Sequence, residues 1–168
     1  MSTHRPAVAI GGEFHLVDHH GREVSDRTYL GKPVLIFFGF THCQMVCPET
    51  LGRLTRALDL LGDKADQIQP LYITVDPDRD SSEVMREFLQ QSYPRFTGLT
   101  GDAAEIERVK HHYKVFAQRA ERDDGEGYDM PHSAMIFVMG PQGNYVTHFS
   151  NATTAEEIAG RLTTILES

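Results

Sequence analysis

Two cysteines, Cys43 and Cys47, are the residues of this chain with the clearest capacity for chemistry. They are its only cysteines, and they lie where an apolar run, residues 34–38, gives way to a helical pattern that starts at Pro48. Thiols near a helix N-terminus are favoured as thiolates, which attack disulfides and bind metals. The alternative is a purely structural role, as small buried hydrophobes or as a local disulfide. The placement favours a metal site or a redox pair.

A third ligand is expected among the nine histidines, because two thiolates leave most metal sites incomplete. His132 is the best candidate, since it precedes a predicted core strand that would run beside the first one. His42 is the rival. Adjacent residues of an extended segment point to opposite sides, so His42 and Cys43 would diverge. Met45 and Met130 flank these segments, and their thioethers are soft donors that more often simply fill space.

The ligand types narrow the choice of metal. Two thiolates and one imidazole suit copper as Cu(I) or Cu(II), and thiolate softness favours Cu(I). Zinc would need a fourth ligand or a water molecule. A redox pair would need no histidine, but the usual redox motif has two residues between its cysteines and this chain has three. The spacing favours a metal and leaves the redox pair open.

Carboxylates follow the second predicted strand, residues 71–75, and should lie at the same edge of the sheet as the cysteines. Asp76 is predicted to orient a metal-binding side chain or to face a docking partner. Asp80 is interpreted as a helix N-cap, in a capping-box-like arrangement with Glu83. The pairs His19–His20 and His111–His112 are interpreted as surface histidines, because neighbours in a turn or on a helix diverge.

The elements that must position these residues alternate between strands and helices. Pro48 suits the first helical position, which makes Cys47 a cap-like residue and leaves Cys43 before the helix. Residues 121–127 are polar and glycine-bearing, and we expect a mobile surface loop there. The predicted elements are a hairpin over residues 13–24, strands at 34–38, 71–75 and 96–99, helices at 48–61 and 84–93, a helix from Asp102 to Phe116, a second hairpin over 133–149 and a last helix opened by Thr154.

This order predicts the α/β class. We expect a thioredoxin-like fold with a central mixed sheet flanked by helices and an N-terminal hairpin. Residues 1–10 are expected to be a flexible N-terminal segment and residues 11–168 a single thioredoxin-like domain. A chain of 168 residues can bury a substantial core without disulfide staples.

Charge and hydropathy exclude some partners. Sixteen Lys and Arg against 24 Asp and Glu give a net charge of −8, and no basic stretch could follow a phosphate backbone, so we expect no nucleic-acid partner. The longest apolar run is far shorter than the roughly 20 residues that span a bilayer. The start of the sequence lacks a secretory signal, which predicts a cytosolic protein unless a signal or anchor precedes this segment.

Four features together resemble the Sco/SenC family. They are Gly39-Phe40-Thr41-His42-Cys43-Gln44-Met45-Val46-Cys47-Pro48, Val75-Asp76-Pro77-Asp78-Arg79-Asp80, Leu99-Thr100-Gly101 and His132. The resemblance runs from Glu13 to Leu166, and the combination is more specific than any one motif.

The resemblance implies a thioredoxin-like copper-binding factor that assembles the binuclear copper centre of cytochrome c oxidase. It implies that Cys43, Cys47 and His132 are the copper ligands and that Asp76 and Asp80 are paired acids. The implied partners are the copper-receiving subunit of the oxidase and another copper chaperone. Family members are usually membrane-tethered. We therefore expect the periplasmic side of the bacterial inner membrane or the mitochondrial intermembrane space, with a membrane contact only through an anchor absent from this chain.

We therefore expect a copper metallochaperone rather than an enzyme. The alternative is a thiol-disulfide oxidoreductase, with Cys43 and Cys47 as its catalytic pair, that reduces a target's cysteines before metal insertion. A peroxidase is a weaker third option, because a Thr-x-x-Cys arrangement is missing. Two departures from the family pattern bear on this choice. Gln44-Met45-Val46 replaces a usual Pro-Asp-Val, and Pro131 replaces a frequent Asp, in a place like that of the thioredoxin cis-proline.

Overall fold

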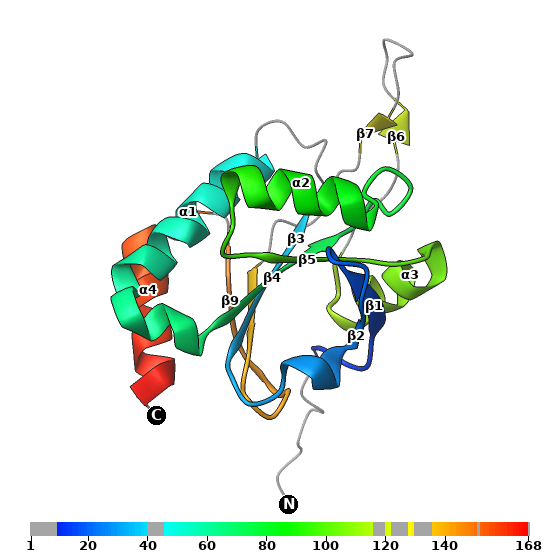
Figure 1. The fold of residues 1–168 in the computed structure, drawn as a ribbon. Helices are drawn as coiled ribbons and strands as arrows, with labels where there is room; N and C mark the ends of the chain where they lie inside the picture. Colours follow the sequence, from blue (N-terminus) through cyan, green and yellow to red (C-terminus); the bar gives the residue numbers. More distant parts are fainter. Residues whose placement is uncertain are drawn as a thin grey trace, which may run out of the picture.

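A computed structural model describes residues 10–39, 46–115, 120–121, 128–129, 136–150 and 152–167. Within these residues, seven strands form one mixed sheet in the order β2-β1-β5-β4-β3-β8-β9, with helices on both faces (Figure 1). The strands are β1 (His15–Asp18), β2 (Glu23–Ser25), β3 (Val34–Gly39), β4 (Gln69–Thr74), β5 (Thr97–Thr100), β8 (Ile136–Met139) and β9 (Tyr145–Phe149). The helices are α1 (Val46–Leu61), α2 (Ser82–Ser92), α3 (Ala103–His112) and α4 (Ala155–Glu167), with short 3-10 helices η1 (Asp26–Tyr29) and η2 (Gly62–Gln67).

The apolar strand β3 is central, as the sequence predicts. It pairs in parallel with β4 and antiparallel with β8, and each of its six residues is buried. Alternate residues of a strand point to opposite faces. Leu35 and Phe37 accordingly join the core under α1, α2 and α4, while Ile36 and Phe38 join the core under β1 and α3. A strand covered on both faces has no polar side, which explains its continuous apolar sequence.

The predicted N-terminal hairpin is confirmed. β1 and β2 pair antiparallel, and β1 also pairs antiparallel with β5. The turn between them is held by Asp18, whose Oδ1 accepts from the backbone N–H groups of His20 and Arg22. The interpretation of His19 as a surface residue is wrong. Its side chain is 7% exposed, and its Nδ1 accepts a 2.8 Å hydrogen bond from the backbone N–H of Gly98 in β5.

Two helix starts are capped as predicted. The Asp102 carboxylate accepts from the N–H of Glu105 at 2.8 Å, and the Thr154 hydroxyl accepts from the N–H of Glu157 at 3.1 Å. The interpretation of Asp80 as an N-cap is wrong, because Ser81 caps α2 by accepting from Val84 at 3.3 Å.

The start of α1 also differs from the expectation. The helix begins at Val46, so Cys47 is its second residue rather than a cap before it. Pro48 is the third residue of the helix. A proline is tolerated at this position, because the first four N–H groups of a helix have no intrahelical partner.

Two short strands border the predicted polar loop. β6 (Ala120–Glu121) pairs antiparallel with β7 (Tyr128–Asp129), so Glu121 belongs to a strand, and residues 122–127 lie outside the described residues.

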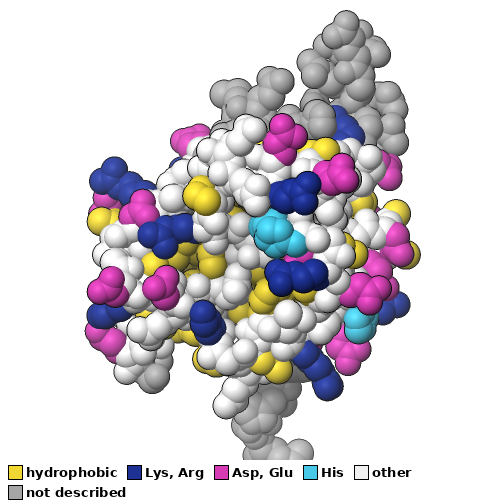
Figure 2. Space-filling view, viewed as in Figure 1, with side chains coloured by type: hydrophobic (Ala, Val, Ile, Leu, Met, Phe, Trp, Pro, Cys, Tyr) yellow, Lys and Arg dark blue, Asp and Glu magenta, His cyan; other side chains and the backbone are white. Residues whose placement is uncertain are grey.

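Acidic and basic side chains are interspersed over the face that Figure 2 shows. Among the described helices, none is both long and apolar enough to cross a membrane.

Candidate functional site

The sequence places its candidate ligands on two segments, and the structure describes the elements that lead into them. Cys43 and His132 lie outside the described residues, as do Met45 and Pro131. Cys47 is described by its backbone alone, in the first turn of α1. The described elements that lead to these segments are the ends of β3 and β4, the start of β8 and the turn after β4.

The end of β3 and the start of β8 lie at one edge of the sheet. β3 runs toward this edge and ends at Gly39, which is paired with Thr74, the last residue of β4. The backbone N–H of Val75 donates to the carbonyl of Gly39 at 2.8 Å and extends this pairing by one bond. β8 runs the opposite way and begins at Ile136, opposite Phe37. The described chain thus leaves β3 and enters β8 at the same edge.

A buried hydrogen-bond network closes this edge. The Thr74 hydroxyl donates to Asp80 Oδ2 at 2.8 Å and accepts from the backbone N–H of Asp76 at 2.9 Å. The Thr100 hydroxyl, at the end of β5, donates to the backbone carbonyl of Asp80 at 2.7 Å. Thr74 and Asp80 are each 0% exposed and Asp76 is 2% exposed. Buried polar groups at these positions are costly unless they are paired, so the network fixes their geometry.

The turn after β4 carries its own ion pair. Arg79 Nε donates to Asp76 Oδ2, and the backbone N–H groups of Arg79 and Asp80 both donate to the carbonyl of Asp76. This coiled turn directs the carboxylate of Asp80 back toward β4. A carboxylate that is 0% exposed cannot present its charge on the surface, so the burial of Asp76 and Asp80 favours an orienting role over a partner-facing one.

Sequence reasoning did not single out Thr74, and it noted Thr100 only within Leu99-Thr100-Gly101, without a role. A signal was present, because Thr74 and Thr100 each end a strand, and β4 and β5 both run parallel to β3. Parallel strands place their last residues at one edge. In the part of the chain that the structure describes, no group of three or more His, Cys, Asp or Glu side chains could hold a metal ion. The described carboxylates Asp76 and Asp80 therefore lie at the end of β4 and form no metal site of their own among the described residues.

Comparison with known proteins identifies the family. The model of the SCO1/SenC family matches residues 2–167, which is nearly the whole chain. The chain belongs to the SCO1/SenC family. The "Protein SCO2 homolog, mitochondrial" of Danio rerio is 37% identical over 155 residues, which are 90% of this chain and 56% of that protein. The human protein of the same name is 35% identical over 157 residues, 92% of this chain and 59% of its own length. The chain thus spans less than two thirds of these relatives.

Solved SCO1/SenC structures have the same fold. Bradyrhizobium japonicum ScoI with copper bound is 41% identical, with a TM-score of 0.86 over 94% of this chain and 99% of that one. Yeast Sco1 with copper bound is 33% identical, with a TM-score of 0.87 over 95% and 90% of the two chains. The predicted thioredoxin-like architecture, a mixed sheet flanked by helices, is confirmed.

Proposed function

We propose that this SCO1/SenC chain is a copper metallochaperone. Cys43 and Cys47 bind copper as thiolates, His132 completes a three-ligand site, and the ion is cargo that passes to a target protein. The proposed destination is the binuclear copper centre of cytochrome c oxidase, through its copper-receiving subunit, and another copper chaperone would supply the ion.

One observation carries the proposal. The end of β3, which leads to the cysteine segment, and the start of β8, which follows His132, lie at the same edge of the sheet. Ligands separated by more than eighty residues in the sequence are thereby attached to neighbouring strand ends. The relatives with copper bound, at 41% and 33% identity, support copper as the ion.

The chemistry of the ligand set suits transfer. Two thiolates favour Cu(I), and a neutral imidazole adds a third donor without further charge. A three-coordinate ion has an open face where a thiol of the target can bind before the first ligands leave. Asp76 and Asp80 assist by holding the end of β4 in place next to Gly39, where the cysteine segment begins.

The location follows the same proposal. Several relatives carry the word mitochondrial in their names, and a SCO2-like protein of the bacterium Rickettsia felis is 36% identical over 94% of this chain. We place the domain in the mitochondrial intermembrane space or on the periplasmic side of a bacterial inner membrane, as a membrane-tethered domain.

Copper titration of the reduced protein tests the ligand set. We expect one equivalent of Cu(I) to bind the natural protein, and Cys43→Ser, Cys47→Ser and His132→Ala each to weaken binding at least about tenfold. His111→Ala, on the exposed side of α3, is the control and should bind as the natural protein does. Unchanged binding in all three ligand variants would overturn the site.

The same variants separate the chaperone from a thiol-disulfide oxidoreductase. A disulfide exchange reaction needs both cysteines and no imidazole. If the chain acts as a reductase, His132→Ala will reduce a disulfide-bonded target peptide at the natural rate. If copper transfer is the function, His132→Ala will lose delivery of Cu(I) to a dithiol acceptor.

A further inference from the structure

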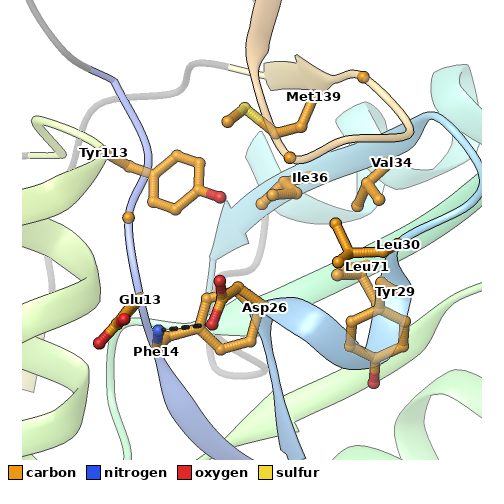
Figure 3. A pocket seen from close by; sticks show the side chains of 13 residues that line it. Glu13, Phe14, Asp26, Tyr29, Leu30, Val34, Ile36, Leu71, Tyr113 and Met139 are labelled. Atoms are coloured by element: carbon orange, nitrogen blue, oxygen red, sulfur yellow. Dashed lines mark hydrogen bonds between the residues drawn. The ribbon is translucent and has the colours of Figure 1, made fainter.

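A cavity lies beside the first half of β3, away from the strand end at Gly39. Its volume is about 210 Å³, and Figure 3 shows that it opens between the strap of residues 12–14, the 3-10 helix η1 and the face of the sheet. Val34 and Ile36, in the first half of β3, form part of its floor, whereas the cysteine segment follows the far end of that strand. The apolar residues that line the cavity include Phe14, Val34, Ile36, Leu71 and Met139.

Two polar groups point into this apolar space. The Tyr113 side chain is 3% exposed, and its hydroxyl is directed into the cavity, toward the carboxylate of Asp26 (Figure 3). Among the described residues, no hydrogen bond reaches this hydroxyl. Asp26 receives one hydrogen bond there, a long one of 3.4 Å from the backbone N–H of Phe14. The Tyr113 hydroxyl therefore opens onto the cavity with its hydrogen-bonding capacity available to a ligand that carries a complementary polar group.

The charge of the cavity selects the kind of ligand. Among the described residues that line it, Asp26 directs its carboxylate toward the cavity, the exposed Glu13 turns its carboxylate away (Figure 3), and none is Lys, Arg or His. Burial, and next the nearby Asp26 carboxylate, raise the pKa of Tyr113, so the phenol stays protonated. An ammonium group could donate to both Asp26 and the phenol oxygen, while an anion would be repelled.

The volume sets the size of the ligand. An apolar cavity of about 150 Å³ is large enough to bind benzene. A cavity of about 210 Å³ therefore suits one ring, or a similar branched alkyl group, with a short substituent. We propose that this cavity is a binding site for a small organic ammonium compound, with its apolar body against β3 and β4 and its nitrogen between Asp26 and Tyr113. This site is independent of the proposed copper function.

Titration of the reduced, copper-free protein with three matched probes tests this site by amide chemical shifts. 2-Phenylethylammonium should bind, 2-phenylethanol should bind about tenfold or more weakly, and 3-phenylpropanoate should not bind. Asp26→Asn should weaken the ammonium compound about tenfold, and Tyr113→Phe about fivefold. Tyr29→Phe is the control, because Tyr29 lines the cavity but its hydroxyl points away from it (Figure 3).

Any of three results would overturn the proposal. They are no binding by the ammonium probe at millimolar concentration, equal binding by the anionic probe, and unchanged affinity in both Asp26→Asn and Tyr113→Phe. Thermal unfolding guards against misfolded variants. Because no hydrogen bond from a described residue reaches the Tyr113 hydroxyl, Tyr113→Phe should unfold at the same temperature as the natural protein or higher, whereas loss of a structural hydrogen bond would lower it.

Discussion

Thr74 shows how much one side chain can organise. Its single hydroxyl serves as donor to Asp80 and as acceptor for the N–H of Asp76, and both partners are buried. Because Thr74 is also paired with Gly39, it joins the acidic turn to the strand that leads to the cysteines. Its role was hidden in the sequence, where a threonine in an apolar strand looks like an ordinary β-branched residue.

Replacing Thr74 should therefore be costly. Thr74→Val keeps the shape of the side chain but leaves the Asp80 carboxylate and the Asp76 N–H each short of one partner, and we expect about 2–3 kcal/mol less stability. Thr74→Ser, which retains the hydroxyl, should lose less. Urea unfolding of the reduced protein measures both. Thr147→Val, at a half-buried position of β9, is the matched control and should change stability by less than about 0.5 kcal/mol. Equal costs at Thr74 and Thr147 would contradict this assignment.

At the scale of elements, local signals predicted more than distant ones. Asp102 and Thr154 were recognisable as caps because a cap and its partner lie three residues apart. Asp80 fits the same local pattern but accepts hydrogen bonds from the hydroxyls of Thr74 and Thr100 instead of capping the helix. The strands that carry these threonines lie beside Asp80 only in the folded sheet. The adjacent Ser81 then takes the cap. The sequence likewise predicted the hairpin of β1 and β2 but not its place beside β5.

The packing of α2 on β5 leaves no room at Gly98. A Cβ added there would lie 2.8 Å from Leu89 Cδ1 and 3.1 Å from Met85 Cε, and both side chains are fully buried. Gly98→Ala should destabilise the protein by about 1–3 kcal/mol through overpacking. Gly160→Ala, in α4, is the matched control, because a Cβ there meets nothing within 4 Å. It should stabilise the helix by about 0.5–1 kcal/mol. The two variants should thus shift the urea midpoint in opposite directions, and a shared direction would refute this packing.

At the scale of the whole molecule, the charge state of one buried histidine affects global stability. Burial, followed by the neighbouring His20, lowers the pKa of His19 below its usual 6.5; Arg22 and Arg86 act in the same direction, while Asp18 opposes them. The unfolded chain therefore binds a proton near pH 6.5 that the folded protein does not accept until lower pH. Stability is complete above pH 6.5 and falls as the pH drops below it.

Urea unfolding at pH 7.5 and pH 5.5 measures this loss, which cannot exceed about 1.4 kcal/mol per pH unit for one proton. His19→Asn is the informative variant, because its Oδ1 can accept from Gly98 in place of Nδ1 and does not titrate. The variant should lose less stability than the natural protein between the two pH values. His111→Asn, at an exposed position of α3 away from His19, should keep the natural pH dependence. An identical loss in the natural protein and His19→Asn would refute this role.

Cysteine spacing and the position of His132 predict a copper site, and this stays a prediction because Cys43 and His132 lie outside the described residues. The buried carboxylates and threonines at the ends of β4 and β5 were not predictable, because their contacts depend on which strands become neighbours. His19 was misjudged for the same reason, since its burial comes from β5 and not from its own turn.

The antiparallel pairing of β3 with β8 also has a consequence for biosynthesis. Val34 pairs with Met139, so the central strand gains this neighbour only after more than a hundred further residues have been made. A chain emerging from the ribosome therefore carries Cys43 and Cys47 long before it carries His132, the third ligand of the proposed copper site. During that interval the thiols can be oxidised or can bind the wrong metal ion. Fast folding of the last third of the chain would shorten the interval.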